Sequence, residues 1–152
     1  MSKLIVYDTN VFVSYLLSPN KEGTIKTVVE RIREKQAIPV YSDAIMAEYD
    51  KVLHYTKFGF SHATIRTFLQ SVVDNGCHVV PVATSVYFRD ESDKCFYDAA
   101  ISAHADWLIT GNKSRLRTAN AGFAQRMPFP RRTLHCKRDG VLGAHRRKVM
   151  RL

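Results

Sequence analysis

The chain has 152 residues, of which 45% are hydrophobic, so it is long and apolar enough for one domain with a buried core. It contains no run of about eighteen apolar residues, and Asp8 comes too early for the apolar region of a signal peptide, so we expect neither a membrane span nor a leader. The three cysteines lack metal-type spacing, which favours free thiols and the reducing cytoplasm.

The net charge of +9 is unevenly distributed along the chain. Residues 113–152 hold twelve Lys or Arg and a single acid, Asp139, which is a surplus of +11, whereas residues 1–112 carry a net −2. The high pI therefore describes the C-terminal segment and not the body. Because Pro and Gly interrupt that segment, we predict a domain over residues 1–116 and a loosely structured, basic extension over residues 117–152.

Short apolar runs alternate with amphipathic segments in the body of the chain. The predicted strands are residues 4–7, 37–41, 77–82 and 107–110. The predicted helices are residues 11–17, 24–35, a segment capped by Ser42 and Asp43, a segment from Ser61 or His62 to a stop at Gly76, and 93–103. This alternation predicts an α/β fold, a three-layer α/β/α sandwich with a central, mainly parallel sheet of four to five strands.

The segment 11–17 is rich in residues that favour strands, yet we interpret it as a helix. Asp8, Thr9 and Asn10 precede it and are suitable capping residues. A hairpin would need a tight turn across these residues, and they include no Gly. The first strand is therefore expected to lead directly into a helix.

Four polar residues fall where a parallel sheet would gather them. Asp8 follows the first strand, Glu48 lies about two turns into the helix after the second, Asp93 opens a helix, and Asn112 follows the last predicted strand. Ligands of open parallel sheets bind at the carboxyl ends of the strands. The six histidines show no metal-ligand spacing, so no zinc site is expected.

Glu48 is the most informative of the four because it lies within the apolar stripe of its helix. A buried, unpaired carboxylate would cost several kcal/mol or take up a proton. An exposed edge position or a Lys or Arg partner would explain Glu48 equally well, and helix capping alone would explain Asp8 and Asp93. If the three carboxylates converge, a hard divalent cation would remove their mutual repulsion.

Four segments together resemble the PIN domain family in order and spacing. They are Leu4 to Ser14, Ala47 to Leu53, Arg89 to Ala100 and Ala105 to Asn112. The resemblance covers residues 4 to about 116 and implies a nuclease fold with a Mg²⁺ or Mn²⁺ site. The family's sheet usually ends with a short final strand after the fourth of these segments. In this chain Arg-rich residues occupy that place, and the sequence indicates no such strand.

The resemblance also assigns roles to single residues. Asp8, Glu48 and Asp93 match the metal-binding and catalytic acids, and Asn112 matches a position that is often Asp and sometimes Asn. Asp98 is a secondary metal candidate, although such a residue is more often solvated on a helix. The residues that would contact RNA or the metal shell are Thr9, Asn10, Thr110, Arg115 and Arg117.

Within the family, the chain is most similar to the small prokaryotic toxins of toxin–antitoxin pairs. The implied function is a metal-dependent endoribonuclease with RNA as substrate and a cognate antitoxin as partner, and these toxins often pair as homodimers. Two alternatives remain. A non-catalytic RNA-binding or regulatory protein would use the basic segment alone. An aspartyl phosphatase would use Asp8 as a nucleophile, but it usually has a second acid where this chain has Asn10.

Overall fold

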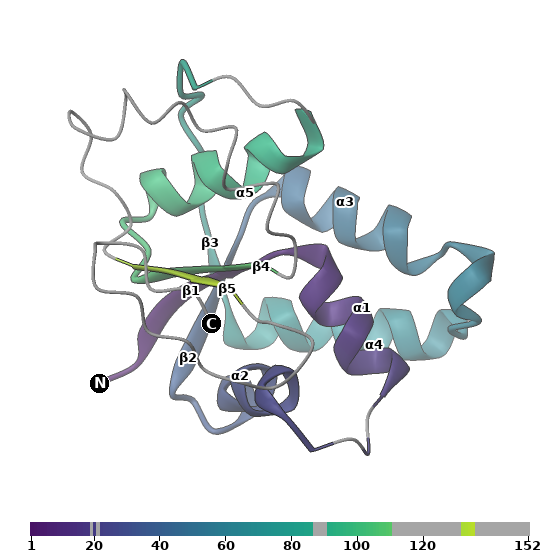
Figure 1. Ribbon diagram of the computed structural model, residues 1–152. Coiled ribbons are helices and arrows are strands. Elements are labelled where there is room, and N and C mark those ends of the chain that lie inside the picture. The colour runs from purple at the N-terminus through teal and green to yellow at the C-terminus, as the bar shows by residue number, and fades with distance from the viewer. Residues whose placement is uncertain (19, 21, 87–90, 111–131, 136–152) are drawn as a thin grey trace.

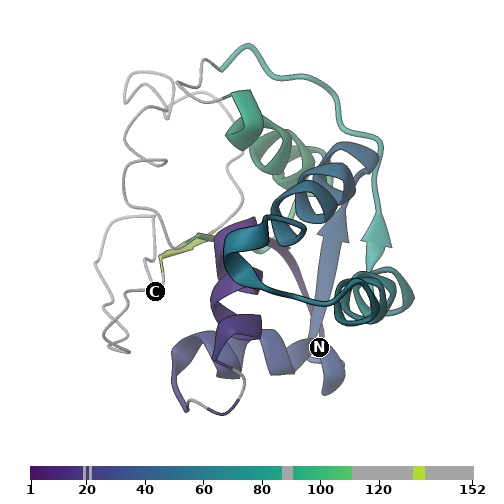
Figure 2. The ribbon, with the colours of Figure 1, turned by 90° about the vertical axis from the view of Figure 1, so that its right-hand side faces the viewer.

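The computed structural model describes residues 1–18, 20, 22–86, 91–110 and 132–135 (Figure 1). Five strands form one sheet in the order β3-β2-β1-β4-β5, and every pair of neighbours is parallel. The strands are β1 (Lys3–Tyr7), β2 (Ala37–Tyr41), β3 (Cys77–His78), β4 (Trp107–Thr110) and β5 (Arg132–His135). Figure 2 shows β2 and β3 running in the same direction. The predicted parallel sheet is confirmed.

Helices cover both faces of the sheet, as the alternation of strands and helices predicts. They are α1 (Thr9–Leu17), α2 (Thr24–Arg33), α3 (Asp43–Leu53), α4 (His62–Asn75) and α5 (Glu91–Ser102), with a short 3-10 helix η1 (Thr56–Phe58) between α3 and α4. Helix α5 lies on one side of the sheet, and α2 and α4 lie on the other (Figure 1). Within the described residues, none of the helices is long and apolar enough to cross a membrane.

Local capping fixes where the helices begin. The Ser42 hydroxyl accepts a hydrogen bond from the amide of Ile45 at 3.3 Å, and the Ser61 hydroxyl accepts one from the amide of Thr64 at 3.1 Å. Each bond satisfies an amide that the first helical turn leaves without a partner. Asp8 caps α1 in the same way, which confirms that the segment after the first strand is a helix.

Strand β3 is shorter than the predicted strand over residues 77–82, because its partner β2 ends at Tyr41 and the chain after β3 turns to helix α5. The Val82 amide donates to Ser102 Oγ at 2.9 Å, and the Thr84 amide donates to Asp98 Oδ1 at 3.0 Å. These bonds hold the segment that follows β3 to α5. The side chains of Val80 and Val82 are exposed as a result.

Gly76 ends α4, as predicted, but the physical reason is close packing. Its φ is −103°, which any residue can adopt, so a left-handed conformation is not required. A Cβ atom at this position would lie 2.4 Å from the carbonyl oxygen of Val72 and 2.7 Å from that of Pro39. The end of α4 therefore reaches β2 only because residue 76 has no side chain.

We expect Gly76→Ala to lower the free energy of unfolding by about 1–3 kcal/mol, because backbone atoms would have to move apart. Urea denaturation followed by circular dichroism measures this change. Gly59→Asn is the matched control. Its φ of +67° suits Asn, and nothing lies within 4 Å of an added Cβ. Equal stability of the Gly76→Ala variant and the wild type would contradict the packing argument.

The final strand that the sequence did not indicate is present. Strand β5 pairs with β4, and His135 is in register with Thr110. The expectation of a segment without regular structure after residue 116 is therefore wrong for residues 132–135. The proposed boundary between a domain and an extension stays a prediction, but the sheet takes its last strand from beyond that boundary.

Candidate metal and catalytic centre

Asp8 occupies the carboxyl end of the central strand β1 and is 2% exposed. Its Oδ2 accepts a hydrogen bond from the Thr110 hydroxyl at 2.5 Å, and its Oδ1 accepts one from the Asn10 amide at 3.4 Å. The Asp8 amide donates to the carbonyl oxygen of Ile109 at 2.8 Å. The carboxylate is therefore held between the ends of β1 and β4, where open parallel sheets bind ligands.

Helix α3 is attached to the same edge of the sheet and carries Glu48. The Tyr49 hydroxyl donates to the carbonyl oxygen of Tyr7 at 2.5 Å, which ties α3 to the end of β1. The Glu48 side chain is 19% exposed, and its Oε2 lies 3.6 Å from Lys51 Nζ. The Lys partner considered from the sequence is therefore present. The contact is long and Lys51 is exposed, so Glu48 keeps most of its capacity to bind another cation.

Helix α5 brings Asp93 and Cys95 to the acidic residues. The pKa of the Cys95 thiol is raised to about 12, mainly by burial and then by the negative charges of Glu48, Asp93 and Asp8. Burial and a negative neighbour both disfavour a thiolate. All three predicted acids thus act on one thiol, although they come from α3, α5 and the end of β1. We call Asp8, Glu48 and Asp93 the acidic centre.

The donor chemistry of the acidic centre suits a hard cation. Carboxylate oxygens are the ligands that Mg²⁺ and Mn²⁺ prefer. The Thr9 hydroxyl, next to Asp8 in the chain, is buried and makes no hydrogen bond to any described residue. Within the part of the chain that the structure describes, no three His, Cys, Asp or Glu side chains form a closed metal-binding group. The residues therefore fit a divalent ion by type, without a complete set of ligands around one point.

The other candidates have different positions. Asp98 is buried, and its Oδ1 accepts hydrogen bonds from the amide and the hydroxyl of Thr84, at 3.0 and 2.6 Å. Its contacts hold the segment after β3 to α5. Asn10 is exposed, and its amide contributes to the cap of α1. Asn112, Arg115 and Arg117 lie outside the described residues.

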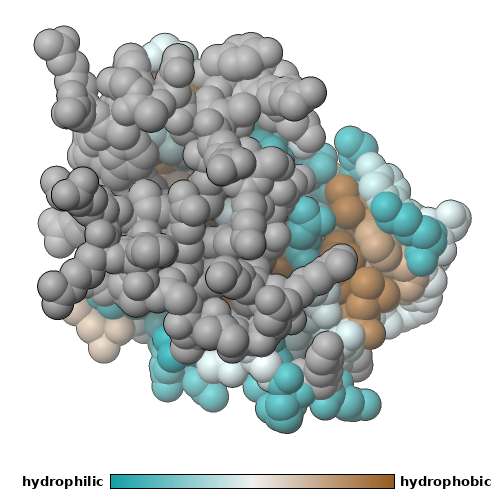
Figure 3. All heavy atoms as spheres, in the orientation of Figure 1, coloured by the Kyte–Doolittle hydropathy of each residue, from teal (hydrophilic) through white to brown (hydrophobic). Residues whose placement is uncertain are grey.

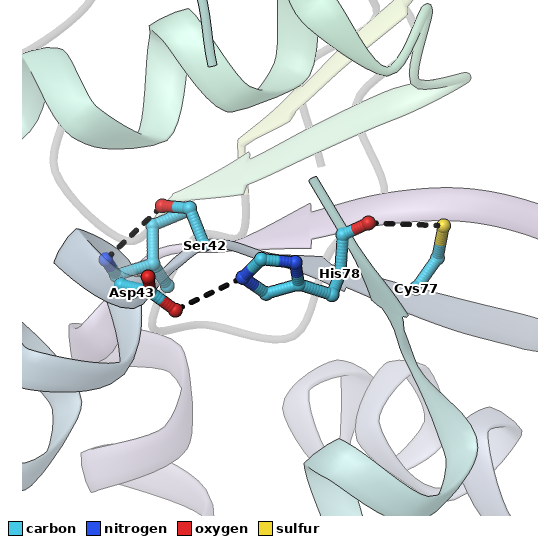
Figure 4. A network of polar contacts seen from close by, with 5 residues as sticks. Ser42, Asp43, Cys77 and His78 are labelled. Atoms are coloured by element: carbon cyan, nitrogen blue, oxygen red, sulfur yellow. Dashed lines mark hydrogen bonds and ion pairs between the residues drawn. The ribbon is translucent and has the colours of Figure 1, made fainter. Parts of the chain in front are cut away.

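A separate polar network lies at the ends of β2 and β3 (Figure 4). His78 Nε2 lies 2.9 Å from Asp43 Oδ1, and Ser42 caps α3 beside them. The Cys77 thiol and Asp43 are exposed. This network connects β3 to the first turn of α3, and so it helps to fix the helix that carries Glu48.

The raised pKa of Cys95 has a measurable consequence. At pH 8 the thiol stays protonated, so we expect iodoacetamide to alkylate Cys95 at least about a hundredfold more slowly than the exposed Cys77. Glu48→Gln removes one negative charge and should raise the rate at Cys95. Mass spectrometry of the separate peptides gives both rates. Equal rates at Cys95 and Cys77 would contradict the effect of burial, and an unchanged rate at Cys95 in Glu48→Gln would contradict the effect of the acids.

Comparison with known proteins decides the family. The family model described as PIN domain matches residues 4–114. The chain belongs to the PIN domain family. The matched residues contain β1 from its second residue, β2 to β4 and α1 to α5, and therefore the whole acidic centre of this PIN domain.

Two solved structures are similar to this PIN domain. The structure of the PIN domain endonuclease Utp24 shares 17% identity, with 76% of this chain and 75% of that chain covered and a TM-score of 0.47. VapBC2 from Rickettsia felis, solved bound to a DNA fragment from its promoter, shares 14% identity, with 77% and 94% covered and a TM-score of 0.49. Among curated proteins, none matches the sequence.

Proposed function

We propose that this PIN domain protein is a metal-dependent endoribonuclease that acts in the cytoplasm. The observation that carries the proposal is the placement of Asp8 at the end of β1 with Glu48 on α3 and Asp93 on α5 nearby, so that all three charges reach the buried Cys95 thiol and add to the effect of burial in raising its pKa. A fold rarely gathers three negative charges at a strand end without a cation to offset their repulsion. Family membership supports the choice of nucleic acid as substrate.

In this proposal Asp8, Glu48 and Asp93 hold Mg²⁺ or Mn²⁺, with Asn112 as a further oxygen ligand. Such an ion lowers the pKa of a bound water and offsets charge on the phosphate. Thr110 keeps the Asp8 carboxylate in one orientation through its hydroxyl. The acidic centre would otherwise repel a phosphodiester, so RNA binding there depends on the cation.

We further propose that the protein is a toxin whose partner is a small antitoxin protein. Apolar side chains gather over α1 and α3 on the face seen in Figure 3. Leu17, at the end of α1, and Tyr55, just after α3, are exposed, and Leu16, Val52 and Phe58 are only partly buried. Exposed apolar patches commonly mark protein interfaces. An antitoxin with a basic segment would also complement the net −2 charge of residues 1–112.

The partner proposal predicts an adjacent reading frame that encodes a small protein. Expression of this chain alone should arrest growth, and co-expression of that small protein should restore it through a stable complex. A solitary gene whose product is harmless would argue against a toxin. If light scattering of the purified chain shows a stable dimer instead, the apolar surface is used by a second copy.

The nuclease proposal is tested with two substrates. Purified protein is incubated with single-stranded RNA or with a small phosphate monoester, each with Mn²⁺ or with EDTA. We expect RNA cleavage only with the metal and no hydrolysis of the monoester. Metal-dependent release of phosphate with intact RNA would support the phosphatase. Tight RNA binding without any cleavage would support the non-catalytic protein.

A further inference from the structure

A second candidate site lies in the groove between α3 and α4, on the other side of α3 from the acidic centre. The groove has a volume of about 320 Å³ and an apolar floor that includes Met46 and Leu69. Residues two positions apart on a helix point in nearly opposite directions, so Met46 and Asp50 face away from Glu48. His54 and His62 line the groove where the two helices approach, and both are exposed.

The two histidine rings face one another with fixed roles for their nitrogens. His54 Nδ1 lies 2.7 Å from the carbonyl oxygen of Asp50, which can only accept, so Nδ1 carries the hydrogen. The Asp50 carboxylate lies 3.4 Å from the same nitrogen. In the neutral ring, His54 Nε2 therefore has a lone pair, and it lies 3.1 Å from His62 Nδ1. Metal-binding histidines are commonly held in this way by a carbonyl or carboxylate.

We propose that His54 and His62 bind a borderline divalent metal such as Zn²⁺ or Cu²⁺. Metal–nitrogen bonds are about 2.0–2.1 Å long. For two nitrogens 3.1 Å apart, the nitrogen–metal–nitrogen angle would therefore be about 98°. That angle lies between those of square-planar and tetrahedral geometry. Imidazole selects these metals, whereas Mg²⁺ prefers oxygen ligands. The sequence did not indicate this pair, because the eight-residue separation matches no zinc motif.

The surroundings set how tightly the ion is held. Asp50 offsets part of its charge, but Arg66 lines the same groove and opposes it. Among the described residues, no third His, Cys, Asp or Glu completes the site, so water would fill the remaining positions. The bound ion would connect the residue that follows α3 to the first turn of α4. It would stabilise the helix that also carries Glu48, whether or not the protein is a nuclease.

A hydrogen bond between the two rings would also explain the distance between their nitrogens. Binding of copper distinguishes a metal site from a hydrogen bond alone. Cu²⁺ is added to the full chain with excess Mg²⁺, which occupies oxygen sites, and electron paramagnetic resonance counts the nitrogens bound to copper. We expect a two-nitrogen spectrum that is lost in His54→Asn and in His62→Asn. His104→Asn is the matched control. His104 is exposed just before β4, at the opposite edge of the sheet, and its φ of +50° suits Asn.

Affinity for Zn²⁺ provides the second measurement. Loss of either ring should weaken binding at least about tenfold, as loss of even an outer ligand commonly does. Arg66→Gln removes the opposing charge and should tighten binding severalfold without adding a ligand. The proposal is overturned if His54→Asn or His62→Asn keeps the wild-type copper spectrum, or if the wild type shows no nitrogen-bound copper. Circular dichroism of each variant verifies that it is folded.

Discussion

Replacing Asp8 by Asn is expected to lower RNA cleavage at least about a hundredfold while leaving the fold intact. Asn has the same shape, and its side-chain oxygen can still accept from the Thr110 hydroxyl. The contact that is lost is the bond from the Asn10 amide, which is long at 3.4 Å and therefore weak. Removal of a buried negative charge carries little cost for stability. The metal, however, would lose its central carboxylate, and with it much of the charge stabilisation of the reaction.

Asp106→Asn is the matched control for this prediction. Asp106 is a partly buried acid just before β4, at the opposite edge of the sheet, and it accepts from the Leu4 amide at 3.1 Å. Cleavage of a labelled single-stranded RNA is measured for both variants under the same conditions. Wild-type activity in Asp8→Asn would remove Asp8 from the centre, and equal losses in both variants would show a general defect of folding.

The second large effect is expected in the salt dependence of RNA binding. Strand β5 runs parallel to β4, so His135, its last residue, lies at the sheet edge that also holds Asp8. Residues 136–152 follow with six Lys or Arg and one acid. Each phosphate neutralised on a single strand contributes about −0.7 to the slope of log affinity against log salt. Replacing Arg146, Arg147 and Lys148 by Gln should therefore flatten the slope by about 2.

Three cations at the other edge of the sheet provide the control. Arg31, Arg33 and Lys35 are exposed at the end of α2 and precede β2. Their replacement by Gln removes the same charge and should leave the slope unchanged. Charge variants are preferable to a truncation near Arg117, which would remove β5 from the sheet. If the two triple variants have equal slopes, the basic segment is only a solvated tail.

Helices and strands whose ends are set by neighbouring residues could be predicted from the sequence. Those whose ends depend on residues far away in the chain could not. Ser42 and Ser61 cap the helices that they precede, and the signal lies within three residues. Strand β5 forms by pairing with the free edge of β4, and the sequence near residue 132 contains no pattern that predicts a strand. Strand β3 ends early because its partner β2 ends at Tyr41, and Asp98 and Ser102 hold the chain that follows it.

For the acidic centre too, some features could be predicted from the sequence and others could not. Asp8 could be placed from the sequence because it follows a strand, and Glu48 because it interrupts an apolar stripe. The hydrogen bond from the Thr110 hydroxyl that orients Asp8 joins two residues that are 102 positions apart in the sequence. The role of Tyr49 also depends on a carbonyl group of β1. Such side-chain hydrogen bonds leave no periodic pattern, so only the structure reveals them.

Direct binding of Mn²⁺ to the full chain tests the central claim, that Asp8, Glu48 and Asp93 form a metal centre. Titration with Mn²⁺ is followed by the electron paramagnetic resonance of the free ion, for the wild type, Asp8→Asn and Asp106→Asn. We predict that Mg²⁺ competes for the bound Mn²⁺, that Asp106→Asn binds like the wild type, and that Asp8→Asn binds at least about tenfold more weakly. Unchanged Mn²⁺ affinity in Asp8→Asn, or RNA cleavage that continues in EDTA, would contradict the account.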